Sequence, residues 1–274
     1  MSAQAVPEGK YTNVGDGLRV HYHEAGSGPP VVFLHGSGPG ASGYSNFKGN
    51  FPCFAEHGFR ALVPDTVGFG HSSKPEDVDY DFPLVVGALS RFLERLGVER
   101  CAVVGNSHGG AVAIELALRA PDLVSKLVLM APGGLETRER YMELKGIRSM
   151  MRAVTAPEGI TRESIRKVLG HQLFDSSLVS DELVEERFQI AVTQPKRVFS
   201  TLKVPHLAPR LAEIACPVLG FWGNEDQFCP VSGAGILSEG CRRSRVTRIS
   251  QCGHWVMVEY ATFFNRTSVD FLKE

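Results

Sequence analysis

The 274-residue sequence lacks a surplus of charge of either sign, because 29 lysines and arginines stand against 30 aspartates and glutamates for a formal net charge of -1. A nucleic-acid-binding protein usually carries a basic patch or stripe, and none stands out here. Glycine and proline, with 29 and 16 residues, are too few for a collagen-like or low-complexity chain. We therefore expect a globular protein without a nucleic-acid partner.

Long apolar runs are absent as well. No segment approaches the ~18 apolar residues that a membrane-spanning helix needs. The segment 1–17 has no basic stretch followed by an apolar one, as a secretory signal would. The six cysteines form no C-x-x-C pair and no zinc-ligand spacing, so we expect free thiols. These absences predict a cytoplasmic protein with no membrane association and no bound metal.

What the sequence does contain is an alternation of short apolar runs and longer helical patterns. Unbroken runs such as VVFL and LVLMA are typical of strands buried on both faces of a parallel sheet. Alternation of this kind predicts an α/β fold with a mostly parallel sheet. The expected strands are 18–22, 31–34, 60–63, 101–104, 126–130, 217–222 and 245–249, and the expected helices between them are 83–96, 110–118 and 262–272.

One long segment, from residue 132 to about residue 210, shows no convincing strand. Its helix-like stretches are 138–153, 162–173, 181–192 and 197–202. Ligands of open α/β sheets bind at the carboxyl ends of the strands, so a helical insertion there is typical of a lid. We therefore predict a core domain of residues 1–132 and 211–274 and a helical lid of residues 133–210. The alternative is a helical decoration with no part in the site.

The strongest local signal is the sequence G-N-S-H-G at residues 105–109, between the apolar run 101–104 and a helical pattern. This is G-x-S-x-G in the strand–turn–helix context that its mechanism requires. The tight turn lifts the hydroxyl of Ser107 above the sheet, and the backbone N–H of His108 faces the same space at a helix N-terminus. The pattern predicts a nucleophilic serine.

A serine at neutral pH needs a base, and the base needs an acid that orients it. His254 follows the last apolar run and would lie at the same edge of the sheet. Either Glu225 or Asp226, in the turn after the run 217–222, satisfies the spacing for the acid. The order serine, acid, histidine along the chain is that of the α/β hydrolases.

Two other patterns indicate different functions. His21 and His23 alternate on one expected strand and suggest a metal site, but no third ligand is near, so a structural role is favoured. The segment 38–43 has the form G-x-G-x-x-G after a strand, with Asp65 further along, which imitates a dinucleotide-binding fingerprint. Pro39 removes one backbone N–H from that loop, so a nicotinamide-dependent oxidoreductase is a minor alternative. A non-catalytic ligand-binding protein on the same fold is another.

Over almost its whole length the sequence resembles an α/β-hydrolase-fold protein. That fold's G-x-x-D-x-x-x-P pattern, at 223–230, selects Asp226 over Glu225. H-G-S-G-P-G-A at 35–41, followed by an aromatic residue, serine and asparagine, resembles the meta-cleavage product hydrolases. G-N-S at 105–107, G-H-W at 253–255, and F-D followed by Arg187 fit the same family. The resemblance implies an eight-stranded sheet with helices on both faces and a lid before the strand of the catalytic aspartate.

The resemblance also implies an activity. These enzymes split the C5–C6 bond of a 2-hydroxy-6-oxo-hexa-2,4-dienoate, a ring-fission product of aromatic catabolism, after a keto–enol tautomerisation. The products are 2-hydroxypenta-2,4-dienoate and a carboxylic acid. The expected protein is thus a serine-dependent carbon–carbon bond hydrolase that needs no cofactor and acts on a small-molecule dienoate. Association into a homodimer or larger homo-oligomer is implied as well. A carboxylesterase on the same fold is the main alternative.

The family pattern assigns roles to nine residues. They are Ser107, Asp226 and His254 as the catalytic triad, the backbone N–H groups of Ser37 and His108 as the oxyanion hole, and Asn46, Asn106, Arg187 and Trp255 as substrate-binding residues. From the residues alone, Arg187 is equally well a solvated charge on a helix, satisfied by Glu182 or Glu186. Likewise, the two asparagines are suited to turn capping, and Trp255 to burial without ligand contact.

Overall fold

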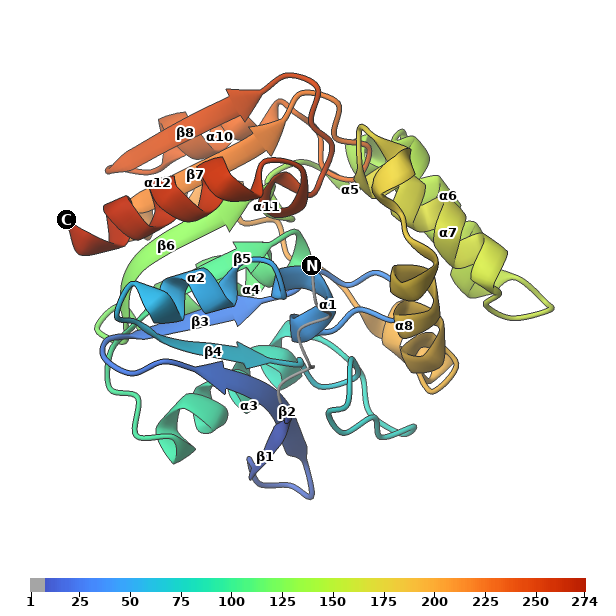
Figure 1. Ribbon diagram of the computed structural model, residues 1–274, viewed down its shortest axis with the longest axis horizontal. Coiled ribbons are helices and arrows are strands. Elements are labelled where there is room, and N and C mark those ends of the chain that lie inside the picture. The colour runs from blue at the N-terminus through green and yellow to red at the C-terminus, as the bar shows by residue number, and fades with distance from the viewer. Residues whose placement is uncertain (1–7) are drawn as a thin grey trace.

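A single eight-stranded sheet runs through the computed structural model, which describes residues 8–274 (Figure 1). Its strand order is β1-β2-β4-β3-β5-β6-β7-β8. The pairings β1–β2 and β2–β4 are antiparallel, and all the others are parallel, so the predicted mostly parallel sheet is confirmed. The strands are β1 (Lys10–Asn13), β2 (Arg19–Ala25), β3 (Pro30–Leu34), β4 (Arg60–Pro64), β5 (Cys101–Asn106), β6 (Val124–Met130), β7 (Val218–Gly223) and β8 (Ser244–Ile249).

The central strands are buried on both faces, which explains their unbroken apolar sequences. In β3, Val31 and Phe33 join one hydrophobic cluster, whereas Val32 and Leu34 join the other. This alternation follows from the period of two along a strand. Every residue of β5 and β7 is buried. The sheet therefore separates two cores, and its seven apolar strands could be found from sequence.

Helices cover both faces of the sheet (Figure 1). The helices α3 (Phe82–Arg95), α4 (His108–Arg119) and α10 (Gly233–Gly240) contribute to one core. The opposite core takes residues from α2 (Phe51–Glu56), α11 (Val256–Glu259) and α12 (Ala261–Lys273). A further short helix, α1 (Gly43–Phe47), begins at a capping box in which the Ser42 and Ser45 side chains each accept from the other's backbone N–H. This cap fixes the loop that leads from β3 toward the site.

The segment between β6 and β7 is helical, as predicted. It contains α5 (Arg138–Met142), α6 (Lys145–Thr155), α7 (Arg162–Gln172), α8 (Asp181–Ala191) and α9 (Lys196–Thr201), with 3₁₀ turns at Ser176–Leu178 and Ala208–Glu213. The predicted helix over 138–153 is in fact two helices, because Leu144 has extended backbone. Figure 1 shows α5 to α8 beyond the arrowheads of the strands, at the carboxyl edge of the sheet.

Several expectations concern the whole chain. All six cysteines are free thiols, as predicted. No helix among residues 8–274 is both long and apolar enough to cross a membrane. Residues 1–7, which belong to the predicted core domain and to the segment without a signal pattern, lie outside the described residues.

Candidate functional site

Ser107 occupies the sharp turn between β5 and α4. Its φ of 56° and ψ of -119° lie outside the regions that non-glycine residues prefer. The turn is possible because its neighbours are small: a Cβ on Gly105 would lie 2.7 Å from the Cα of Gly110, and one on Gly109 would lie 2.1 Å from the carbonyl oxygen of Leu34. The strained backbone presents the hydroxyl at the carboxyl edge of the sheet, where a nucleophile is accessible to a ligand.

His254 and Asp226 meet in the loops that follow β8 and β7. The Nδ1 atom of His254 lies 2.7 Å from the Oδ2 atom of Asp226, and both side chains are almost fully buried. The other carboxylate oxygen of Asp226 accepts hydrogen bonds from the backbone N–H groups of Phe228 (2.7 Å) and Cys229 (2.9 Å). These contacts fix the imidazole with Nδ1 facing the carboxylate, which leaves Nε2 free to act as a base.

The choice between the two acidic residues left open by spacing is decided by these contacts. Glu225 does not contact the histidine. Its carboxylate instead accepts a hydrogen bond of 3.0 Å from the backbone N–H of Cys252. Asp226 is therefore the carboxylate that orients His254.

A cavity of about 970 Å³ lies between the carboxyl edge of the sheet and the helical insertion. Eight of the nine predicted site residues line it, and Asp226 is set back behind His254. Those eight are Ser37, Asn46, Asn106, Ser107, His108, Arg187, His254 and Trp255. The insertion contributes apolar walls through Ile147, Met150 and Val154. A ligand in this cavity would touch residues from both the sheet loops and the insertion.

One end of the cavity is polar and carries a buried cation. The guanidinium of Arg187 donates to the Oδ1 atom of Asn46 at 2.8 Å, and the amide of Asn46 donates to Asn106 at 3.3 Å. The ring of Trp255 lies 5.1 Å from the guanidinium carbon. Arg187 is only 2% exposed, and its Nε has no hydrogen-bond partner among residues 8–274. Burial lowers the pKa of Arg187 to about 10.

These contacts exclude a solvent-exposed role for Arg187 and a turn-capping role for the side chain of Asn46. Arg187 is not a solvated helix charge, and Glu186 pairs instead with Lys48 at 2.7 Å. The side chain of Asn46 bonds to other side chains rather than to a turn backbone. A buried guanidinium with an unpaired donor is suited to a carboxylate, whose two oxygens match its planar fork.

The loop after β3 is held by buried polar groups. The ring of His35 donates from Nδ1 to the carbonyl oxygen of Gly36 (2.7 Å) and accepts at Nε2 from the backbone N–H of Thr66 (3.0 Å). Burial lowers the pKa of His35, so the ring is neutral. His35 thus supports the loop from within. The loop carries Ser37 to the cavity wall beside Ser107.

The dinucleotide and metal alternatives do not fit the structure. Asp65 is fully buried and accepts hydrogen bonds from the backbone N–H of Gly43 (2.7 Å), from that of His71 (2.8 Å) and from Nδ1 of His21 (2.8 Å). It is therefore committed to the protein rather than to a ribose. A Cβ on Gly40 would lie 1.9 Å from the carbonyl oxygen of Arg187, so this glycine serves packing against α8. Within residues 8–274, no group of three potential metal ligands is gathered.

Three side chains in the cavity wall were not assigned roles from sequence. Cys229, 2% exposed, makes hydrogen-bonding contacts with the side chains of Ser107 and Tyr141, and burial raises the pKa of its thiol well above 9. Tyr141, on α5, and Gln172, at the end of α7, also line the cavity. Cys229 lies within the G-x-x-D-x-x-x-P pattern at 223–230 and Gln172 lies two residues before the F-D pair, whereas Tyr141 falls in no recognisable motif.

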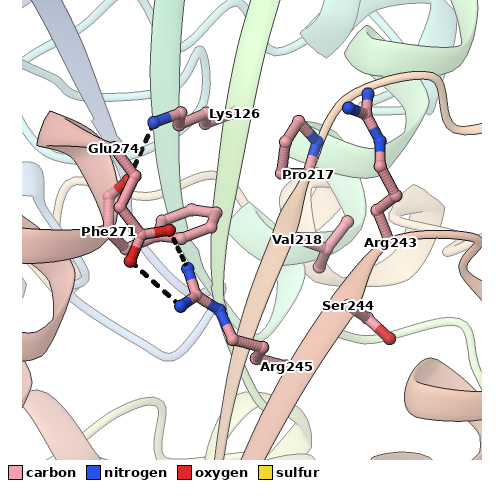
Figure 2. Close-up of a pocket in the computed structure, with 8 residues that line it drawn as sticks. All are labelled: Lys126, Pro217, Val218, Arg243, Ser244, Arg245, Phe271 and Glu274. Carbon is pink, nitrogen blue, oxygen red and sulfur yellow. Dashed lines mark hydrogen bonds and ion pairs between the residues drawn. The ribbon is translucent and has the colours of Figure 1, made fainter.

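A second, smaller cavity of about 350 Å³ lies at the opposite edge of the sheet (Figure 2). Its basic side chains already have partners. Lys126 donates to the carbonyl oxygen of Phe271 at 2.8 Å, and Arg245 binds Glu274 at 3.0 Å. It contains no nucleophile with an adjacent base, so the chemistry belongs to the larger cavity.

Comparison with known proteins gives a consistent result. The profile of the α/β hydrolase fold family matches residues 29–261. A 2-hydroxy-6-oxo-6-phenylhexa-2,4-dienoate hydrolase from Comamonas testosteroni is 34% identical over 93% of this chain and 91% of its own. A 2-hydroxy-6-oxononadienedioate/2-hydroxy-6-oxononatrienedioate hydrolase from Paraburkholderia phymatum is 36% identical over 96% of this chain and 95% of its own.

Comparison with solved structures identifies the same group of enzymes. A meta-cleavage product hydrolase from Pseudomonas fluorescens IP01 superposes with a TM-score of 0.85 at 29% identity, over 97% of each chain. A 2-hydroxy-6-oxo-6-phenylhexa-2,4-dienoate hydrolase from a Rhodococcus strain superposes with a TM-score of 0.87 at 26% identity, over 97% of this chain and 99% of its own. The similarity thus extends over sheet and insertion together.

Proposed function

The chain belongs to the α/β-hydrolase family and, within it, to the meta-cleavage product hydrolases, and from this premise we propose that it hydrolyses the C5–C6 bond of a 2-hydroxy-6-oxo-hexa-2,4-dienoate. The products are 2-hydroxypenta-2,4-dienoate and a carboxylic acid. The observation that carries this proposal is the pairing, in one cavity, of a strained serine with a buried guanidinium whose Nε finds no hydrogen-bond partner within residues 8–274. An ester hydrolase needs the serine, but a dienoate hydrolase needs both.

We assign the covalent chemistry to Ser107, His254 and Asp226. The substrate first ketonises: the proton on the C2 oxygen leaves, the double bonds shift, and C5 gains a proton. Ser107, or a water molecule, then adds to the C6 carbonyl while Nε2 of His254 takes its proton. Breaking the C5–C6 bond releases a dienolate, which is a stabilised leaving group because the ketone at C2 accepts the electron pair. Where Ser107 has added, a water molecule then hydrolyses the acyl-serine and releases the carboxylic acid; where water has added, the acid forms directly. Asp226 keeps the imidazole in the required tautomer through the 2.7 Å contact.

Negative charge on the C6 oxygen is held, in this proposal, by the backbone N–H groups of Ser37 and His108. Both residues line the cavity next to Ser107, one from the loop after β3 and the other from the first turn of α4. The N-terminus of a helix also favours an anion. Losing one donor of this kind typically costs about 3 kcal/mol of transition-state stabilisation.

We assign the carboxylate of the dienoate to the polar end of the cavity. The planar fork of Arg187 can bind both carboxylate oxygens, and Asn46 orients that fork through its 2.8 Å hydrogen bond. Asn106, bonded to Asn46, and Trp255, against the guanidinium, complete this end. The carboxylate of the bound substrate would thus offset the unfavourable free energy of burying the Arg187 guanidinium.

The helical segment 133–210 acts as a lid in this proposal, over a core of residues 1–132 and 211–274. Its side chains Ile147, Met150 and Val154 form apolar walls of the cavity, which suit the substituent on C6. A cytoplasmic location and self-association belong to the same proposal, and light scattering of the purified protein tests the latter.

The test is a small substrate panel. The purified protein is mixed in turn with yellow ring-fission dienoates, p-nitrophenyl esters and NADH with a carbonyl acceptor, and the loss or gain of absorbance is followed. Turnover of the dienoates that exceeds turnover of the esters supports the proposal. Turnover of esters alone would identify a carboxylesterase, and oxidation of NADH would identify an oxidoreductase.

A further inference from the structure

Gln172 ends the lid helix α7 at the point where the lid touches the catalytic loop. Its backbone carbonyl oxygen accepts hydrogen bonds from the backbone N–H groups of His254 (2.7 Å) and Trp255 (3.2 Å). A Cβ on Gly253 would lie 2.6 Å from the same oxygen, so the contact is close. The backbone of Gln172 is therefore fixed relative to the proposed base, and its side chain begins from a fixed place in the cavity wall.

The carboxamide of Gln172 points to the polar end of the cavity. The position that a Cβ would take on Gly38 is 3.8 Å from the Nε2 atom of Gln172 and 3.9 Å from an Nη atom of Arg187. The amide and the guanidinium thus flank the same point of the loop after β3. Gln172 lies within reach of the place proposed for the carboxylate end of the substrate.

The side chain of Gln172 is 7% exposed, and its Oε1 atom has no hydrogen-bond partner among residues 8–274. A buried acceptor without a donor destabilises a protein, because the group has lost its hydrogen bonds to water and forms none within the protein. The Nε atom of Arg187 is likewise unpaired. These two unpaired atoms belong to the amide and the guanidinium that flank Gly38, and together they indicate a ligand that offers both a donor and an acceptor.

We propose that the carboxamide of Gln172 recognises the oxygen on C2 of the dienoate. This inference rests on the proposed dienoate hydrolysis. In the enol form the C2 hydroxyl donates to Oε1 of Gln172. After the proton has moved from that oxygen to C5, the C2 oxygen is a carbonyl and accepts from Nε2. Among neutral side chains, only glutamine and asparagine carry a carboxamide with both functions, and its terminal torsion is two-fold, so the two atoms can exchange places.

The consequence is selectivity for substrates that carry oxygen at C2. A methionine at position 172 keeps the length of the side chain and the backbone contacts to His254, but has no amide. Gln189→Met is the matched control, because Gln189 is exposed on α8 and bonds only to Glu185 in the part of the chain described. Two ligands are compared: a 2-hydroxy-6-oxo-hexa-2,4-dienoate as substrate, and 6-oxo-hexa-2,4-dienoate, which lacks the C2 oxygen, as competitive inhibitor.

The Gln172→Met variant should lose about tenfold to a hundredfold in kcat/KM for the 2-hydroxy dienoate, the range for an unmade hydrogen bond to a buried polar group. The inhibition constant of the compound without the C2 oxygen should stay within about twofold of wild type, as should turnover of a p-nitrophenyl ester. Single-turnover absorbance should place the loss in the disappearance of the enol. Gln189→Met should match wild type throughout.

Three outcomes overturn the inference. A wild-type protein that does not turn over dienoates would contradict the proposed function, and this inference with it. A wild-type protein that does, with unchanged kinetics in Gln172→Met, would contradict the inference alone. Equal losses for dienoate, inhibitor and ester, together with a lower melting temperature, would mean that Gln172 only ties the lid to the loop of His254.

Discussion

Replacing Arg187 by glutamine should stabilise the free protein and disable it as a dienoate hydrolase. Arg187 is 2% exposed, and its Nε has no partner in the part of the chain that the structure describes. Burial lowers its pKa to about 10, well below the ordinary value of a guanidinium, so the unfolded chain binds this proton more tightly than the folded one. At about 1.4 kcal/mol per unit, the charge costs about 3 kcal/mol of folding free energy at pH 7. The cost is constant below pH 10 and declines as the pH rises above the folded pKa.

In contrast to its effect on stability, Arg187→Gln should lower kcat/KM for the dienoate. The dienoate brings a carboxylate into this cavity, and loss of a buried charge partner costs about 2–5 kcal/mol. That range corresponds to a fall in kcat/KM of roughly thirty-fold to several thousand-fold. Lysine should restore only part of the activity, because it lacks the planar fork. A p-nitrophenyl ester has no carboxylate, and its turnover should be nearly unchanged.

The assay has two arms. Denaturant titration at pH 7 without substrate gives the free energy of unfolding, and steady-state kinetics on dienoate and ester give the two values of kcat/KM. Lower stability of Arg187→Gln, together with equal damage on both substrates, would mean that the arginine supports the lid. An unchanged kcat/KM for both substrates would mean that the dienoate carboxylate binds elsewhere.

Four other substitutions test the triad and its surroundings. Ser107→Ala should lower kcat by up to ~10⁶ without unfolding the protein; more than a tenth of wild-type activity would refute its role as nucleophile. Asp226→Asn should cost on the order of 10⁴ in rate, because the imidazole tautomer is lost, and Glu225→Gln should be mild; the reverse result would refute the assignment of the acid. His108 is buried with a pKa of about 3 against 6.5 unfolded, so stability is lost as pH falls below 6.5, by about 2 kcal/mol at pH 5. Urea titrations at pH 7 and pH 5 should show that His108→Met removes this loss, and equal losses in both proteins would contradict the reasoning.

Sequence patterns predicted the elements that carry a continuous apolar signal. The seven apolar strands and the helices α3, α4 and α12 fall close to their expected ranges. The strand β1 differs because its four residues, KYTN, contain no aliphatic residue and so give no apolar signal. Helices α1 and α2, of five and six residues, are too short to show a helical period.

Some site residues could likewise be predicted from local motifs, whereas the roles of others depend on contacts between distant segments. Ser107 and His254 could be predicted because each follows a strand in a motif whose backbone geometry has a chemical purpose. Local spacing could not separate Asp226 from Glu225, since the choice depends on which carboxylate faces another loop. The burial of Arg187 could not be predicted from sequence either, because its neighbours in DELVEERF are mostly charged. It results from the packing of α8 on the loop at Gly40.

The most direct measurement of the central claim is the identity and amount of the products from one turnover. Excess wild-type protein is mixed with a 2-hydroxy-6-oxo-hexa-2,4-dienoate, and the quenched mixture is analysed by mass spectrometry, with Ser107→Ala as the control. We predict equal amounts of 2-hydroxypenta-2,4-dienoate and the carboxylic acid from C6, in wild type alone. Recovery of intact dienoate from a wild-type protein that still hydrolyses p-nitrophenyl esters would contradict carbon–carbon bond hydrolysis.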